Sequence, residues 1–278
     1  MSAQAESVAV KQCGACSSCQ PTGLSGLTRL GVKAGGADYV VALAGNPNTG
    51  KSTLFNALTG LRQHVGNWAG KTVARAEGSF RFNGRQYKII DLPGTYSLLS
   101  TSADEEVARD FVLFGQPDVT IIVADANRLE RNLGLVLQVL EITERAVVAL
   151  NLVDEARRNH VTVDARALAR ELGVPVVPMV ARSGEGVPEL LSAIETTAQS
   201  PSSASPRRLE FADAALRQAV EELTAQLQEV FPTLPNVRWV ALRLLEGDES
   251  IARAVREGTL GELGHAEAPA DHLPLAVR

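Results

Sequence analysis

The chain is short of cysteine, and this shortage limits the kinds of protein it can be. Only three cysteines occur among its 278 residues, and they lie close together as Cys13, Cys16 and Cys19. Because the count is odd and the rest of the sequence contains none, the cysteines do not suggest a secreted scaffold held together by disulfide bonds.

Long hydrophobic runs are also lacking. No apolar stretch approaches the roughly 18 residues that a membrane-spanning helix requires, and residues 1–11 lack the apolar core of a secretory signal. We therefore expect a soluble, cytoplasmic chain, which could still be one part of a protein of the inner (cell) membrane.

Positive charge is in deficit. The chain has 27 Lys and Arg residues against 32 Asp and Glu residues, which gives a net charge of −5. General nucleic-acid binding needs a basic face, so this balance argues against a nucleic-acid partner. Hydrophobic residues make up 45% of the sequence, enough for a substantial core in one large or two small domains.

The clearest motif that is present is a phosphate-binding loop. The pattern G-x-x-x-x-G-K-[S/T] is matched by Gly45, Asn46, Pro47, Asn48, Thr49, Gly50, Lys51 and Ser52, with Thr53 next. An apolar run before the loop predicts a strand and the residues after it predict a helix, which is the context that this motif requires. Glycines let backbone N–H groups turn toward phosphate oxygens, and a helix N-terminus adds positive charge. We expect Lys51 to contact the terminal phosphates during hydrolysis and Ser52 to bind Mg²⁺.

Strand and helix patterns alternate from residue 39 to about residue 199. We predict strands at 39–44, 72–82, 86–91, 119–124, 146–150 and 174–178. Helices are predicted at 51–60, 104–114, 130–143, 164–172 and 187–198. Such alternation predicts an α/β fold with a mostly parallel, doubly wound sheet. Asn83-Gly84 is a hairpin signal, so one edge of the sheet should be antiparallel.

The composition changes on either side of this region. Residues 1–37 read as a flexible tail that contains the cysteines, and residues 38–199 as the nucleotide-binding domain. A Ser- and Pro-rich linker at 200–206 separates it from a small all-α domain at 207–261. The last stretch, 262–278, has little pattern and is predicted to be disordered.

A second motif, which contains an acidic residue, follows the phosphate-binding loop at the end of a predicted strand. It consists of Asp91, Leu92, Pro93 and Gly94. We expect Asp91 to bind Mg²⁺ and the Gly94 N–H to sense the γ-phosphate.

Two later loops predict recognition of a guanine base. Asn151 and Asp154 follow one strand, and Val180, Ala181 and Arg182 follow the next. Asp154 can accept both N–H groups of a guanine edge, Asn151 can tie loops together, and the Ala181 N–H can contact the guanine oxygen. Two residues depart from the usual motifs: Leu152 replaces a lysine, and Val180 replaces a serine whose hydroxyl often braces the aspartate. These departures bear on base affinity more than on base identity.

The segment at 63–72 suits a mobile switch because it is rich in glycine. Its nucleotide-binding candidates are Gly66, Asn67, Trp68 and Ala69, and Thr72 could complete the Mg²⁺ shell when the γ-phosphate is present. We expect Trp68 to be exposed on this loop, with a buried hydrophobic anchor as the alternative.

The glutamine that orients the attacking water in many GTPases is missing. Thr95 stands in its place, so water must be positioned by the backbone, another residue or a partner. Asn48 offers a further route, since its amide oxygen could bind a monovalent cation that neutralises charge on the phosphates.

The cysteine tail is open to two interpretations. The spacing of Cys13, Cys16 and Cys19 can hold zinc or part of an iron–sulfur cluster. No fourth cysteine follows, so the alternative is a disordered tail with three exposed thiols.

Several motifs together resemble one family. GNPNTGKSTLFN at 45–56, VGNWAGKTV at 65–73, DLPGTYSL at 91–98 and LERNL at 129–133 are similar to the cytosolic part of ferrous iron transport protein B. The resemblance covers about 39–260, and its helical portion resembles the guanine-nucleotide-dissociation-inhibitor-like domain of that family. It does not cover the cysteine tail.

The resemblance implies a Ras-like G domain that hydrolyses GTP slowly, releases GDP quickly and responds to K⁺ through Asn48. It also implies control of Fe²⁺ uptake through a membrane permease. Small accessory proteins of the same transport system and a homo-oligomer stay open as partners. In this family N-x-x-D without lysine is usual, whereas Val180 remains a departure.

Two other functions stay open. One is a GTPase that acts on ribosomes or tRNA, because several of these share the Gly-x-Pro-Asn loop, and RNA binding would reveal it. The other is an interaction module gated by nucleotide or metal, which would bind nucleotide without turnover.

Overall fold

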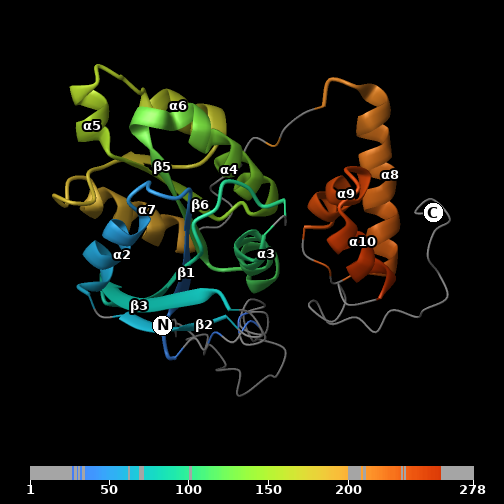
Figure 1. Ribbon diagram of the computed structural model, residues 1–278, viewed down its shortest axis with the longest axis horizontal. Coiled ribbons are helices and arrows are strands. Elements are labelled where there is room, and N and C mark those ends of the chain that lie inside the picture. Colours follow the sequence, from blue (N-terminus) through green and yellow to red (C-terminus); the bar gives the residue numbers. More distant parts are fainter. Residues whose placement is uncertain are drawn as a thin grey trace, which may run out of the picture.

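The computed structural model describes most of the chain as an α/β region followed by a helical region (Figure 1). The described residues are 35–61, 63–68, 72–99, 102–199, 211–232 and 236–257, together with Leu27, Leu30, Val32, Arg208 and Leu234. The cysteines at 13, 16 and 19, the linker predicted at 200–206 and the predicted C-terminal tail lie outside this set.

A seven-stranded sheet forms the centre of the α/β region, in the order β2-β3-β4-β1-β5-β6-β7. The strands are β1 (Tyr39–Gly45), β2 (Gln63–Asn67), β3 (Ala74–Phe82), β4 (Arg85–Asp91), β5 (Val119–Asp125), β6 (Ala146–Asn151) and β7 (Val176–Pro178). Strands β4, β1, β5, β6 and β7 run parallel, and β2 and β3 form an antiparallel edge. Strands β1, β5, β6 and β7 are mostly apolar, as expected for parallel strands that helices cover on both faces.

Helices of the α/β region lie on both faces of the sheet. They are α2 (Lys51–Thr59), α3 (Ala103–Asp110), α4 (Leu129–Ile142), α5 (Val153–Arg158), α6 (Ala165–Leu172) and α7 (Val187–Gln199), with a short 3₁₀ turn at Ala126–Arg128. Apolar residues of α2 and α7 form one core with the sheet, and those of α3 and α4 belong to the other. The predicted doubly wound fold is therefore confirmed.

The helical region contains α8 (Ala214–Val230), α9 (Val237–Leu245) and α10 (Glu249–Arg256). Aspartates begin two of these helices: Asp213 accepts from the Ala215 N–H, and Asp248 accepts from the N–H groups of Ser250 and Ile251. Buried residues of these helices share a hydrophobic cluster with α3 and α4, so the two regions pack together. No described helix is both long enough and apolar enough to span a bilayer.

Three local features differ from the sequence-based prediction. Residues Gln63–Asn67 form the edge strand β2, although the glycine-rich pattern had indicated only a mobile loop. The short helix α5 was not predicted at all. The predicted helix at 104–114 changes register at Phe111, where a π-helix (Phe111–Gly115) continues α3. The hairpin signal is confirmed, since Asn83 and Gly84 both have positive φ and join β3 to β4.

A glycine after β7 holds the next turn tightly against the sheet. Gly186 has φ +82°, and a Cβ there would overlap the Pro178 carbonyl oxygen and lie 2.7 Å from Met179 Cβ. Gly184 has the same φ of +82° but nothing lies within 4 Å of its Cβ position. The two positions therefore separate backbone strain from steric overlap.

We predict that Gly186→Ala lowers the free energy of unfolding by about 3 kcal/mol or more, because left-handed strain and overlap with backbone add together. Gly184→Ala, the matched control, should cost only about 1–2 kcal/mol, which is the strain alone. Urea denaturation of both variants checks this, and equal losses would contradict the packing argument.

Candidate functional site

The phosphate-binding loop joins β1 to α2 at the carboxyl edge of the sheet. Gly50 has φ +84°, and a Cβ there would overlap the Asn151 side chain, so only glycine fits. The Thr49 hydroxyl donates to the Asn46 carbonyl at 2.9 Å, which closes the loop on itself. Asn48 has φ +64° and is exposed, so its amide is available to a ligand.

An ion pair links the phosphate-binding loop to the end of β4. Lys51 Nζ lies 2.5 Å from Asp91 Oδ1, and both side chains are largely buried. Burial raises the pKa of the Asp91 carboxyl above its ordinary value, and the charge and hydrogen bond of Lys51 oppose that shift. Ser52 follows Lys51 in the first turn of α2, so the two expected Mg²⁺ ligands, Ser52 and Asp91, both lie at this turn. Hydroxyl and carboxylate oxygens are the donors that Mg²⁺ prefers, so the residues fit this ion.

Asn151 joins the phosphate-binding loop to the loops predicted to hold the base. Its side chain is buried; Nδ2 donates to the Thr49 carbonyl at 2.9 Å, and Oδ1 accepts from the Ala181 N–H at 2.9 Å. The predicted loop-tying role of Asn151 is thus present in the geometry. A guanine oxygen would have to compete with this amide for the Ala181 N–H.

Asp154 stands in the first turn of α5 with its two oxygens in different surroundings. Oδ2 lies 2.5 Å from Arg158 Nη2 and 3.4 Å from Arg182 Nη2. Oδ1 is buried and has no hydrogen-bond partner among the described residues. Leu152, which precedes the helix, has φ +62°. Val180 is buried and bonds through its N–H to the Glu185 carbonyl at 2.9 Å, which closes a tight turn.

The loop after Asp91 is held from several sides. Gly94 lies beside Pro47, since a Cβ there would be in ordinary contact with it, 3.5 Å from Pro47 Cα. Thr95 is buried and its hydroxyl donates to the Ser97 carbonyl at 2.6 Å. The Arg131 guanidinium lies over the Tyr96 ring, 4.7 Å from its centroid. Thr95 thus uses its hydroxyl within its own loop.

The switch segment contradicts one expectation. Trp68 was expected to be exposed, but only 4% of it is accessible, and its ring meets Phe111 edge-on at 5.3 Å. The reason is that β2 pairs with β3 and directs Trp68 onto the start of the π-helix, so Trp68 is the hydrophobic anchor. Gly66 and Asn67 lie in β2, and Thr72 is exposed just before β3. Ala69 lies outside the described residues.

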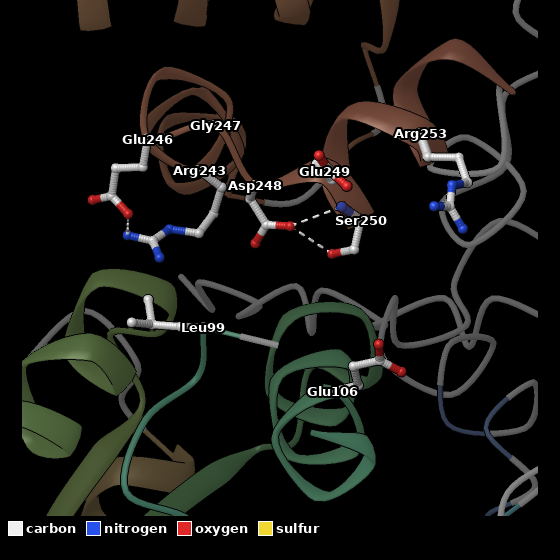
Figure 2. A pocket seen from close by; sticks show the side chains of 9 residues that line it. All are labelled: Leu99, Glu106, Arg243, Glu246, Gly247, Asp248, Glu249, Ser250 and Arg253. Atoms are coloured by element: carbon white, nitrogen blue, oxygen red, sulfur yellow. Dashed lines mark hydrogen bonds and ion pairs between the residues drawn. The ribbon is translucent and has the colours of Figure 1, made fainter. Parts of the chain in front are cut away.

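The helical region meets the α/β region at a polar cleft of about 480 Å³ beside α3 (Figure 2). Figure 2 shows Leu99 and Glu106 facing the turn between α9 and α10, where Asp248 bonds to Ser250. Nearby, Arg109 of α3 is buried and donates through Nη1 to the Ser250 hydroxyl at 3.1 Å. One hydrogen-bonded row therefore runs from α3 to the beginning of α10.

Two protein-family models with known members match most of the described chain. Residues 39–194 match the model of ferrous iron transport protein B, and residues 213–270 match that of the FeoB cytosolic helical domain. The chain belongs to the ferrous iron transport protein B family. The match to the helical domain extends past the described residues.

Individual FeoB proteins agree with this assignment. The Fe(2+) transporter FeoB of Salmonella typhimurium is 45% identical over 212 residues, which is 75% of this chain and 27% of that protein. The chain thus spans about a quarter of the length of this curated relative. The cytosolic domain of L. pneumophila FeoB is 36% identical with a TM-score of 0.72, covering 82% of this chain and 90% of that one. The cytosolic domain of T. maritima FeoB in GDP form II is 37% identical with a TM-score of 0.71, covering 83% and 88%.

Some residues of this FeoB site could not be selected from the sequence. Arg158 contacts Asp154 only because residues 153–158 are helical, and that helix was not predicted. Arg131 and Arg109 belong to predicted helices, but nothing in the pattern showed their partners. No cluster of three or more metal-binding side chains occurs among the described residues, and the cysteine site is a prediction that lies outside them.

We predict that Asn151→Ala lowers the free energy of unfolding by about 2–4 kcal/mol, because it removes two hydrogen bonds and strands the Thr49 carbonyl and the Ala181 N–H. Asn127→Ala is the control: the Asn127 side chain accepts one bond from exposed Asn159. That control should cost about 1 kcal/mol or less. Thermal denaturation without ligand measures both, and similar small losses would show that the loops are not held by Asn151.

Proposed function

We propose that this chain binds and hydrolyses GTP and acts as a switch that regulates Fe²⁺ uptake through a membrane permease. The main support is the Asn151 side chain, which bonds both to the phosphate-binding loop and to the predicted base-binding loop. This arrangement supports a single site in which one nucleotide contacts the first loop with its phosphates and the second with its base. A FeoB cytosolic domain in GDP form, similar to this chain, gives further support.

In this proposal the phosphates lie against the 45–52 loop and Lys51 turns from Asp91 to the terminal phosphate. Ser52 and Asp91 would hold Mg²⁺, with Thr72 added when the γ-phosphate is present. The bound ion would neutralise charge that develops on the phosphates. The Gly94 N–H would sense the γ-phosphate, and the other nucleotide contacts are those predicted from the sequence.

The site lacks the glutamine that would position the attacking water. This lack predicts slow hydrolysis. Thr95 occupies the position of the usual glutamine, but its hydroxyl is already bonded to the Ser97 carbonyl. A K⁺ ion on the exposed Asn48 amide would supply positive charge that the residues themselves lack. The same observation favours one alternative function, a module that binds GTP without appreciable turnover.

The link to iron transport rests on family membership, because the chain spans 27% of its relative's length. The remainder of such a protein would supply the permease, in the same chain or separately. Small accessory proteins and a homo-oligomer belong to the same proposal. As domain boundaries we propose a tail at 1–37, the G domain at 38–199, a linker at 200–206, the helical domain at 207–261 and a C-terminal tail at 262–278.

The direct test is phosphate release from GTP and from ATP with Mg²⁺, first in KCl and then in NaCl. We expect slow release from GTP that is faster in KCl, little release from ATP, and loss of the KCl effect in Asn48→Ala. Equal slow rates in both salts would contradict the K⁺ site, and binding without release would favour the alternative module.

Lys51→Ala provides the negative control for this test. It should weaken GTP binding by roughly 100-fold, since a buried charge pair is worth about 2–5 kcal/mol when one partner is removed. Lys88→Ala is its matched control, because Lys88 pairs with Glu77 on the sheet. Unchanged GTP affinity of Lys51→Ala by calorimetry would refute the assignment of the phosphate site.

The helical domain is proposed to tune nucleotide release through α3. Ser250→Ala removes the hydroxyl that accepts from Arg109 Nη1. We predict GDP release about two- to fivefold faster, as expected for one partly buried bond of about 1 kcal/mol. Asp248 still caps α10 in this variant. Stopped-flow release of a fluorescent GDP analogue measures the effect. Ser192→Ala on α7 is the control, and an unchanged rate for Ser250→Ala would contradict the coupling.

A further inference from the structure

The base-binding loops lack the hydroxyl that would brace the aspartate. Val180 stands at that position, and its buried side chain offers no hydrogen bond to Asp154. An unbraced carboxylate could rotate, and its contact with a base would then be weak and poorly directed. Something else must fix its orientation if the site is to select guanine.

Two arginines surround the aspartate from different elements. Arg158 reaches Asp154 Oδ2 from one turn further along α5 at 2.5 Å, and Arg182 reaches the same oxygen from the turn after β7 at 3.4 Å. The guanidinium groups are planar and make directed bonds to carboxylates, so together they limit rotation of the side chain.

The other oxygen has no such partner. Asp154 Oδ1 is buried and unpartnered among the described residues, and a carboxylate oxygen in that situation favours a donor. The two oxygens therefore differ in role. Oδ2 pairs with the arginines, and Oδ1 is left to accept from a ligand N–H group.

The turn that carries Arg182 is itself well fixed. Ala181 is bonded to Asn151, and the Gly184 N–H donates to the Val180 carbonyl at 3.0 Å. Arg182 thus extends from a backbone that is tied both to the phosphate-binding loop and to its own turn. Its side chain is 78% exposed, so each ion pair is worth little alone and the effect requires both.

We propose that Arg158 and Arg182 are positioning residues that replace the missing hydroxyl and orient Asp154 so that its Oδ1 accepts from the 2-amino group of guanine. The inference rests on the proposed function, since it concerns the base that this site selects. It predicts that base discrimination, rather than phosphate affinity, depends on the two arginines.

The experiment measures dissociation constants of GDP and IDP by calorimetry, because inosine lacks the 2-amino group that Asp154 would accept from. The test variant is Arg158→Ala with Arg182→Ala. The control is Arg157→Ala with Arg170→Ala, which removes the same charge: Arg157 pairs with Glu185, and Arg170 lies on α6.

We expect the unchanged chain to bind GDP more tightly than IDP. In the test variant the preference should fall about fivefold, the effect of two weak ion pairs, while the control keeps the preference. Adding Val180→Ser, or the nearly isosteric Val180→Thr if the first fails to fold, should restore part of it by supplying a hydroxyl.

Other outcomes separate the two proposals. An equal loss of GDP and IDP affinity in the test variant would overturn the inference, since the arginines would then act only through charge. An unchanged preference would overturn it as well. If the unchanged chain binds neither nucleotide, the proposed function itself fails.

Discussion

The site depends on one buried amide. The parallel strands bring several loops to the same edge of the sheet, but a shared edge does not fix the loops against one another. The Asn151 side chain does so, because it donates to one loop and accepts from another within a dry environment. The spacing between the end that would hold phosphates and the end that would hold a base is therefore set before any ligand arrives.

The opposite end of the site is held in a different way. Lys51 and Asp91 neutralise each other across the space where phosphate and cation are proposed to bind. A phosphate that arrives together with a cation can pair with both residues, the phosphate with Lys51 and the cation with Asp91. A phosphate alone would take Lys51 and leave the buried Asp91 carboxylate unpaired. Rigid spacing at the base end and an exchangeable ion pair at the phosphate end suit a site that responds to the third phosphate.

The sequence predicted those parts of the molecule that local patterns determine. Apolar runs were enough for every strand except β2 and for every helix of the α/β region except α5. The candidates along 45–52, 91–94 and 151–154 came from local motifs and stay predictions. The sequence-based prediction missed β2 because this edge strand is half exposed and contains glycine, so its pairing with β3 came from tertiary structure. It missed α5 because that helix begins after Leu152 in a left-handed conformation, which a leucine rarely adopts. Trp68 was misplaced for the same reason as β2, and Arg158 was overlooked for the same reason as α5.

The π-helix after α3 has a mechanical consequence. It makes Ala103–Gly115 a single continuous rod whose register shifts at Phe111, so that side chains on either side of the shift point in directions that a regular helix would not combine. Arg109 contacts Ser250 of the helical region, and Phe111 contacts Trp68 at the end of the switch strand. Because one helical segment makes both contacts, we expect a displacement at Ser250 to disturb the packing of Trp68, and the reverse.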